Sequence, residues 1–216
     1  ILRRRKTLTK LKSGLTATID LSESCVLSYT HPNIFAAAVA WYRLTTVSSY
    51  LKNILRHYSL LDFGAGTGEL AHLIPPAANY YYCEQESVLA QFIKRDNANA
   101  NRVTDIQALT SESFDVITCL DSLEHNTEIS QIIEGLVALL KPGGLLIVSG
   151  PTENAIYKLG RRIAGFSGDY HHTNIYEIER LVECHLNIKS KRYVPFGMPL
   201  FSISIWEKTI DTRFTS

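Results

Sequence analysis

The stretch that decides the fold is Leu-Leu-Asp-Phe-Gly-Ala-Gly-Thr-Gly at residues 60–68. Its first half completes a short apolar strand predicted over 59–63, and a helix is expected directly after the glycines. Gly64, Gly66 and Gly68 let the backbone turn sharply and approach a ligand without Cβ atoms in the way. A strand–glycine loop–helix unit directs loop amides toward a ligand lying above the carboxyl ends of parallel strands. The stretch therefore predicts a nucleotide-type site on an α/β sheet.

Strands and helices alternate on both sides of this loop, which indicates a parallel sheet covered on both faces. The last two strands are joined by a short segment and suggest an antiparallel hairpin. The expected helices lie over 33–57, 69–73, 87–95, 128–140 and 174–183, with an irregular stretch or short helix in the 150s and 160s. The other expected strands lie over 80–83, 102–105, 114–120, 145–149, 188–195 and 201–207, with a turn at 141–144.

The acidic residues around the loop indicate which nucleotide it takes. The dinucleotide fingerprint has glycine where this chain has Glu69, and a carboxylate there would repel a pyrophosphate. Glu84 ends the second strand, 22 residues after Asp62, where a carboxylate can accept hydrogen bonds from both ribose hydroxyls. Asp105 follows the third strand, where an acid can accept from an adenine amino group. These features imply a phosphate-free adenosine ligand, S-adenosylmethionine.

Four motifs in order carry a family resemblance. Residues 60–68 resemble the first motif of class I S-adenosylmethionine-dependent methyltransferases, and residues 113–117, 123–125 and 139–145 are similar to its later motifs. The likeness is to the small-molecule and ubiquinone-type group, and it runs from about residue 58 to 207. It implies a single Rossmann-like, doubly wound α/β domain. Its seven-stranded sheet would be mostly parallel, with an antiparallel final strand.

Carried over by position, the resemblance implies a cofactor site along the carboxyl edge of the sheet. The glycines would pack against the methionine moiety, Asp62 would support its amino end, and the sulfonium would lie near the end of the fourth strand. The implied cofactor residues are Asp62, Gly64, Ala65, Gly66, Gly68, Glu84, Asp105, Ile106 and Leu120.

The acceptor side is predicted from residues after the fourth strand. Asp121, Glu124 and His125 follow an acid-x-x-Glu-His spacing, similar to a divalent-ion cluster of ubiquinone-type and small-RNA 3′-end methyltransferases. Asp at the first position has a shorter reach, so a structural or substrate-orienting His125 without metal is preferred, with a metal site as the alternative. The expected catalytic residues are Asp121, His125 and His171, with His172 as an alternative to His171. No Asn/Asp-Pro-Pro-Tyr motif is present, which argues against the common DNA and protein-glutamine methyltransferases.

Charge is unevenly distributed along the 216 residues, whose formal net charge is +1. Residues 1–12 hold six basic side chains and no acid, so the remaining 204 carry 16 basic against 21 acidic residues, a net of −5. Such a body is a poor nucleic-acid binder, which excludes DNA and disfavours RNA. The basic arm is expected to be a solvated, frayed terminus, with weak contact to an anionic membrane surface or RNA as the alternative.

The domain and compartment predictions follow from composition. Residues 1–57 are expected to form the basic arm and a helical cap, and residues 58–216 the cofactor-binding domain. Arg43, within the cap, is expected to be solvated, with a pair to the cofactor carboxylate as the alternative. Four dispersed cysteines without zinc spacing, and no apolar stretch after the arm as in a signal peptide, predict a cytoplasmic protein.

The function predicted from the sequence is methylation of an oxygen of a small molecule, lipid-linked precursor or glycan. Three alternatives stay open: metal-assisted methylation of an RNA or catechol-like hydroxyl, a non-catalytic S-adenosylmethionine-binding module, and a nicotinamide dehydrogenase. Glu69 and the terminal hairpin argue against the last.

Overall fold

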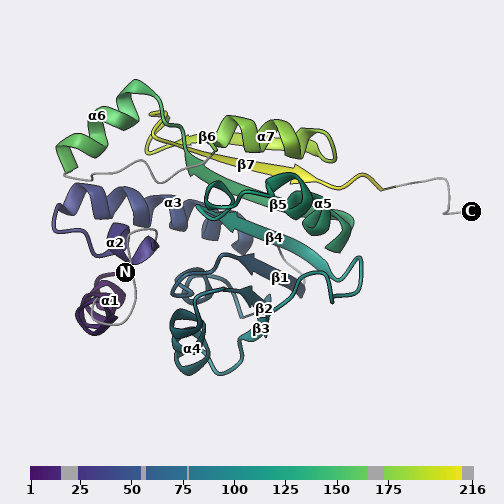
Figure 1. Ribbon diagram of the computed structural model, residues 1–216, viewed down its shortest axis with the longest axis horizontal. Helices are drawn as coiled ribbons and strands as arrows, with labels where there is room; N and C mark the ends of the chain where they lie inside the picture. The colour runs from purple at the N-terminus through teal and green to yellow at the C-terminus, as the bar shows by residue number, and fades with distance from the viewer. Residues whose placement is uncertain (16–23, 55–56, 77, 165–172, 211–216) are drawn as a thin grey trace, which may run out of the picture.

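The structure is a computed structural model that describes residues 1–15, 24–54, 57–76, 78–164 and 173–210. It is built around one twisted sheet with helices on both faces (Figure 1). None of the described helices is both long enough and apolar enough to cross a bilayer.

The sheet has seven strands in the order β3-β2-β1-β4-β5-β7-β6. All pairings from β3 to β5 are parallel, whereas β7 runs antiparallel to both of its neighbours. The expected mostly parallel, doubly wound fold with a reversed final strand is therefore confirmed. The strands are β1 (Tyr58–Phe63), β2 (Ala78–Cys83), β3 (Asn101–Val103), β4 (Phe114–Leu120), β5 (Leu140–Pro151), β6 (Asn187–Val194) and β7 (Phe201–Glu207).

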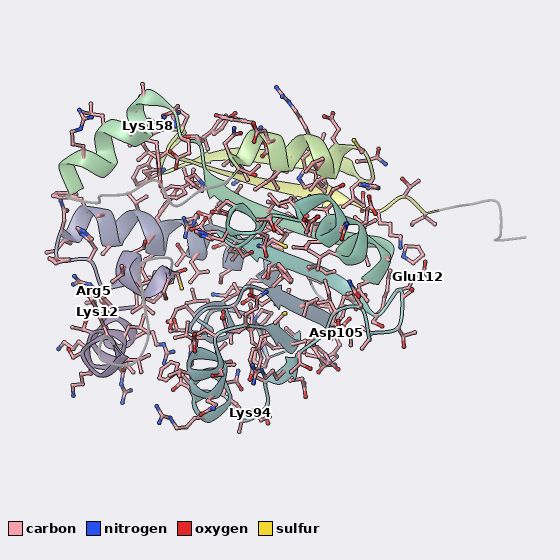
Figure 2. All side chains as sticks on the ribbon, viewed as in Figure 1. Arg5, Lys12, Lys94, Asp105, Glu112 and Lys158 are labelled. Carbon is pink, nitrogen blue, oxygen red and sulfur yellow. The ribbon has the colours of Figure 1, made fainter. Side chains whose placement is uncertain are left out.

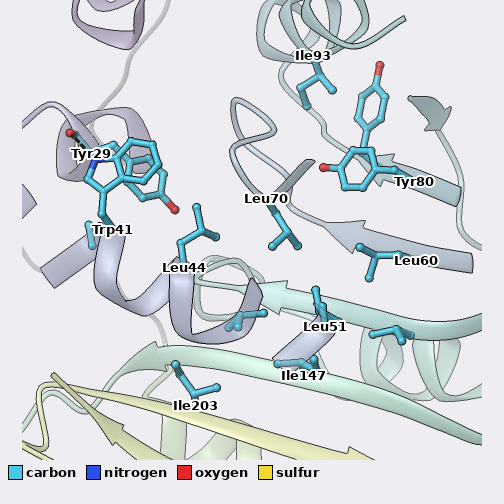
Figure 3. Packing of buried hydrophobic residues seen from close by; sticks show 14 of the residues in the cluster. Tyr29, Trp41, Leu44, Leu51, Leu60, Leu70, Tyr80, Ile93, Ile147 and Ile203 are labelled. Carbon is cyan, nitrogen blue, oxygen red and sulfur yellow. Dashed lines mark hydrogen bonds between the residues drawn. The ribbon is translucent and has the colours of Figure 1, made fainter. Parts of the chain in front are cut away.

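Helices of opposite faces bury alternate residues of the central strands, because successive strand side chains point to opposite sides. Leu60 of β1 packs in one cluster with α1 (Leu2–Leu15), α2 (Cys25–Tyr29), α3 (Ile34–Lys52) and α4 (Ser87–Asp96). Figure 3 shows this cluster, in which Trp41, Leu44 and Leu51 of α3 lie over the strands.

The other face is covered by α5 (Ile129–Leu139) and α7 (Ile175–Glu183), which pack against Leu61 and its neighbours. The start of α7 follows the expectation from the sequence. The Asn174 side chain accepts from the amides of Tyr176 and Glu177 at 3.0 and 3.1 Å, which caps the helix. The remaining helix, α6 (Ala155–Ala164), follows β5 at the edge of the molecule.

Several boundaries differ from the sequence prediction. α3 ends at Lys52 rather than 57, and the expected helix over 69–73 is only the 3₁₀ turn η1 (Leu70–His72). The Pro-Gly-Gly segment at 141–144 was expected to be a turn, but it lies inside β5. Leu140 pairs with Phe114 of β4 and Leu145 pairs with Val116, so residues 141–144 fall in the register shift between these pairs. The amide of Gly143 donates instead to the carbonyl of Lys208 at 2.9 Å.

The basic N-terminus is not a frayed arm, which corrects the expectation from charge alone. Residues 2–15 form α1, and Leu8 is fully buried in the cluster of α1–α4. The apolar contact anchors the helix, so its basic side chains are presented from an ordered element. The domain boundary after residue 57 stays a prediction.

Candidate functional site

The glycine loop lies between the ends of β1 and β2. Gly64, Gly66 and Gly68 all have positive φ, at 72°, 58° and 74°, a region that other residues occupy only with strain. The amides of Gly64 and Ala65 donate to the carbonyl of Cys83 at 2.9 and 3.2 Å. These bonds hold the loop against the last residue of β2.

Glu84 is brought to the same loop by the parallel register of β1 and β2. Its Oε2 accepts from the amide of Gly66 at 2.7 Å, and its Oε1 accepts from the amide of Glu86 at 2.8 Å. Burial raises the pKa of Glu84, although the amides of Glu86 and Gly66 act to lower it. Glu84 therefore contacts the glycine loop directly, whereas its predicted contact with the ribose stays a prediction.

Asp62 lies beneath the loop as a buried carboxylate. It accepts hydrogen bonds from the hydroxyls of Tyr80 at 2.7 Å and Thr118 at 2.8 Å. Burial raises the pKa of Asp62 to about 6, against these two hydrogen bonds, which lower it. Through these hydrogen bonds Asp62 connects β1 to β2 and β4. Its predicted contact with the cofactor stays a prediction.

This pKa predicts how stability varies with pH. The ordinary pKa of Asp62 is 3.8, so the folded chain favours the protonated acid. The contribution of Asp62 to the free energy of unfolding is complete below pH 3.8 and is lost as the pH rises through about 6. The loss amounts to about 3 kcal/mol. Urea unfolding between about pH 4 and about pH 7 should show this decline in the unaltered protein relative to Asp62→Asn. Parallel pH profiles for the two proteins would contradict the assignment.

Asp105 and Ile106 follow β3, where the sequence placed the adenine contacts. Asp105 is exposed, and its Oδ1 accepts from the amide of Gln107 at 2.8 Å. Burial, then the charges of Glu84 and Asp105, raises the pKa of Cys83 to about 11. The charges of both carboxylates therefore reach Cys83, the last residue of β2. The contact of Asp105 and Ile106 with adenine stays a prediction. Figure 2 labels Asp105 among the side chains.

Arg43 reaches the acceptor side of the site from α3, so its expected solvation is wrong. It is buried, forms an ion pair with Asp121, and its guanidinium carbon lies 4.5 Å from the centroid of the Phe201 ring. Asp121 follows Leu120 directly at the end of β4, has a φ of 54°, and donates its amide to the carbonyl of Ser149 at 2.8 Å. Backbone strain of this kind concentrates at functional sites.

Glu124 and His125 lie on the 3₁₀ turn η2 (Leu123–His125) after Asp121. Glu124 is almost fully buried, and burial, followed by the charge of Asp121, raises its pKa well above its ordinary value. His125 is half-buried. Within the described part of the chain, no three His, Cys, Asp or Glu side chains are grouped to hold a metal. His171 and His172 lie outside the described residues.

Three buried hydroxyls along this edge have no hydrogen-bond partner among the residues that the structure describes. They belong to Thr67 in the glycine loop, Ser122 after β4 and Ser149 near the end of β5. Buried polar groups are normally paired, so unpaired ones at a carboxyl edge indicate a ligand that supplies the partners. Neutral hydroxyls at the same edge as the Glu84 carboxylate suit a phosphate-free nucleoside, so these residues fit the implied cofactor.

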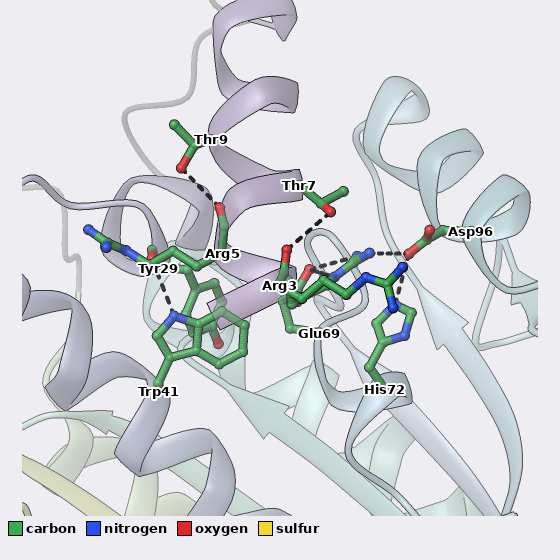
Figure 4. A network of polar contacts seen from close by, with 10 residues as sticks. Arg3, Arg5, Thr7, Thr9, Tyr29, Trp41, Glu69, His72 and Asp96 are labelled. Carbon is green, nitrogen blue, oxygen red and sulfur yellow. Dashed lines mark hydrogen bonds and ion pairs between the residues drawn. The ribbon is translucent and has the colours of Figure 1, made fainter. Parts of the chain in front are cut away.

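The N-terminal helices cover this loop. The guanidinium of Arg4 on α1 binds both oxygens of Glu69, with Nε to Oε2 at 2.8 Å, and also pairs with Asp96. Figure 4 shows Glu69, Asp96 and His72 meeting beneath α1. On α2, the sulfur of Cys25 would lie 2.6 Å from a Cβ added to Gly66. Because Arg4 balances the charge of Glu69, repulsion of a pyrophosphate by Glu69 is a weaker argument than the sequence suggested.

Sequence reasoning missed the helices α1 and α2 and the buried Arg43–Asp121 pair. Arg4 and Glu69 are 65 residues apart, and no periodicity connects them. A signal for Arg43 existed in the composition of α3, where it is a single arginine among mostly apolar residues. A charge on the buried side of such a helix needs a partner.

Part of this chain is similar to known methyltransferases. The profile of a family described as "Methyltransferase domain" matches residues 61–146. A Rickettsia akari protein named ubiquinone biosynthesis O-methyltransferase is 28% identical over 136 residues, which are 58% of this chain and 53% of that protein. A Coxiella burnetii protein of the same name is 42% identical over 108 residues, which are 46% of each. The chain thus spans about half the length of these curated relatives.

A solved structure shows the same fold over most of the chain. Magnesium protoporphyrin IX methyltransferase from Synechocystis PCC 6803, with bound S-adenosylhomocysteine, superposes with a TM-score of 0.65. The superposition covers 82% of this chain and 88% of that chain at 18% identity. The family profile and the curated relatives show that this part of the chain is similar to methyltransferases, and the superposition shows the same fold.

Proposed function

We propose that this protein methylates an oxygen of a small molecule, lipid-linked precursor or glycan. The observation that carries the proposal is the contact of Glu84 with the amide of Gly66, because it assembles a nucleoside-binding edge. The named O-methyltransferase relatives support oxygen as the acceptor atom, and a ring hydroxyl of a ubiquinone precursor as the first acceptor to test.

The residues of the chain divide into a cofactor side and an acceptor side. Gly64, Ala65, Gly66, Gly68 and Glu84 would hold the cofactor, with Asp62, Asp105, Ile106 and Leu120 beside them. S-adenosylmethionine supplies an activated methyl group on its sulfonium. What remains for the protein is to orient the acceptor, exclude water and take up the hydroxyl proton.

On the acceptor side, we assign proton uptake to His125 and positioning to Asp121. Imidazole titrates near neutral pH, which suits a base for a ring hydroxyl. Asp121 is held by Arg43, so it can orient a hydroxyl without itself moving. His171 stays a second candidate base. We further propose a cytoplasmic location, since none of the four cysteines is paired in a disulfide and all four lie in described segments.

The test is turnover with a ring-hydroxyl acceptor of the ubiquinone-precursor type, measured as S-adenosylhomocysteine formed. His125→Ala should lower kcat about 100-fold, as is usual for loss of a general base, while S-adenosylhomocysteine binds unchanged in calorimetry. The matched control is His185→Ala, since His185 is exposed at the end of α7.

The outcomes separate the alternatives. Equal loss in both histidine variants, or full turnover by His125→Ala, would contradict the assigned base. Loss of turnover with a chelator, restored by Mg²⁺, would favour the metal-assisted reaction. Cofactor binding without transfer to any hydroxyl acceptor would identify a binding module instead.

A further inference from the structure

Charge is segregated in the fold beyond what the N-terminal residues alone indicate. The helices α1, α2, α3 and α6 contain eleven of the 22 basic residues and none of the 21 acidic residues. The rest of the chain therefore carries eleven basic residues against 21 acidic ones, a net of −10. α1, α6 and the first turn of α3 lie at the end of the molecule where the parallel strands end (Figure 1).

Several of these basic side chains are available to a partner. Arg4 and Arg43 are engaged with carboxylates, whereas Arg3, Lys6 and Lys10 of α1 are exposed. On α6, Lys158 and Arg162 are exposed. Figure 2 shows Lys158 and the α1 residues Arg5 and Lys12 at this same end.

Large apolar side chains are exposed beside them. Phe35 at the start of α3 is 84% exposed, and Leu159 of α6 is 56% exposed. The turn between β6 and β7 adds exposed Phe196, whose ring lies 4.9 Å from that of Tyr42 on α3. The exposed apolar residues of this end are Ile34, Phe35, Ile156, Leu159, Phe196 and Met198. We call them, with the exposed basic residues of α1 and α6, the basic apolar end.

This combination selects one class of partner. Exposed apolar patches beside basic side chains are the feature by which helices settle into the interface of an anionic bilayer. A nucleic acid would use the basic residues but would leave Phe35 and Leu159 in water. An acidic protein would match the charge, yet α6 presents apolar and basic residues together, as interfacial helices do.

We propose that the basic apolar end docks on an anionic lipid surface. The excess of positive charge in these helices over the rest of the chain would also orient the protein on the lipid. Docking would place the acceptor side of the site, at the same carboxyl edge, toward the bilayer. The inference rests on exposure and charge, and it does not depend on which acceptor is methylated.

The test is binding of the whole chain to vesicles of phosphatidylcholine alone or with phosphatidylglycerol. We expect binding to the anionic vesicles only, decreasing with salt. Phe35→Asp and Leu159→Asp should each weaken it about tenfold or more, because each removes apolar burial and adds repulsion. The control is Ile188→Asp, since Ile188 is 53% exposed at the start of β6, away from the turn between β6 and β7, and it should change binding less than about twofold.

A second pair of variants tests the charge. Lys158→Gln should weaken vesicle binding, and Arg192→Gln, an exposed change on β6, should not. Binding of S-adenosylhomocysteine by every variant verifies folding and separates this proposal from the proposed function. Equal binding to neutral vesicles, or an equal effect of Ile188→Asp, would overturn docking. So would an RNA that binds more tightly than the anionic vesicles and is insensitive to Phe35→Asp.

Discussion

Glu84→Ala should lower the affinity for S-adenosylhomocysteine about 100-fold. The Glu84 carboxylate lies against the glycine loop, with Oε2 2.7 Å from the amide of Gly66. Two hydroxyls of a bound ribose would donate to it, and each hydrogen bond to a charged group contributes about 1.5–3 kcal/mol. Loss of both bonds at the smaller value, about 3 kcal/mol in total, would weaken binding somewhat more than about 100-fold. Isothermal titration calorimetry measures the change directly.

Two further variants give this experiment its controls. Glu84→Gln keeps an acceptor oxygen and should lose less affinity than Glu84→Ala. The Oε1 of Glu86 accepts from the amide of Val88 at 3.2 Å and caps α4. Glu86→Ala removes this cap, so it should lower the free energy of unfolding but leave the affinity for S-adenosylhomocysteine nearly unchanged. If Glu84→Ala binds as tightly as the unaltered protein, the cofactor does not lie where we place it.

Gly64→Ala should be the most destabilising single substitution in the glycine loop. A Cβ at Gly64 would lie well inside van der Waals contact with the Cβ of Ser122, and the φ of 72° strains any side chain. The backbone cannot shift freely, since the Gly64 amide is bonded to the carbonyl of Cys83 at 2.9 Å. Left-handed strain costs about 1–2 kcal/mol, and overpacking adds about 1–3 kcal/mol.

The matched control is Gly197→Ala, because Gly197 has a φ of 79° and no heavy atom within 4 Å of the added Cβ. It should lose only the strain contribution, about 1–2 kcal/mol. Gly68→Ala should fall between them, since its Cβ would meet the Ile93 side chain at 3.0 Å, a longer contact than the one with Ser122 at Gly64. Urea unfolding of the three variants measures the order. Equal losses for Gly64→Ala and Gly197→Ala would show that the contact with Ser122 relaxes without cost.

The parallel strands were predictable because their signals are local. The apolar run over 114–120 became β4 with the predicted bounds, and 201–207 became β7. The spacing from Asp62 to Glu84 predicted their positions on neighbouring strands, since a parallel βαβ-type unit returns the chain to the same edge. Local preference failed at 141–144, where a Lys-Pro-Gly-Gly sequence reads as a turn but lies within β5, in the register shift of its pairing with β4.

The sequence by itself determined the sheet, the glycine loop and the acidic residue beside it, because each depends on short-range pattern and spacing. Only the tertiary structure decided that Arg43 pairs with Asp121, that Arg4 neutralises Glu69, and that α6 exposes Leu159. These contacts join elements far apart in the chain. Which side chains meet there depends on how the helices pack across the sheet, and that packing is a property of the whole fold.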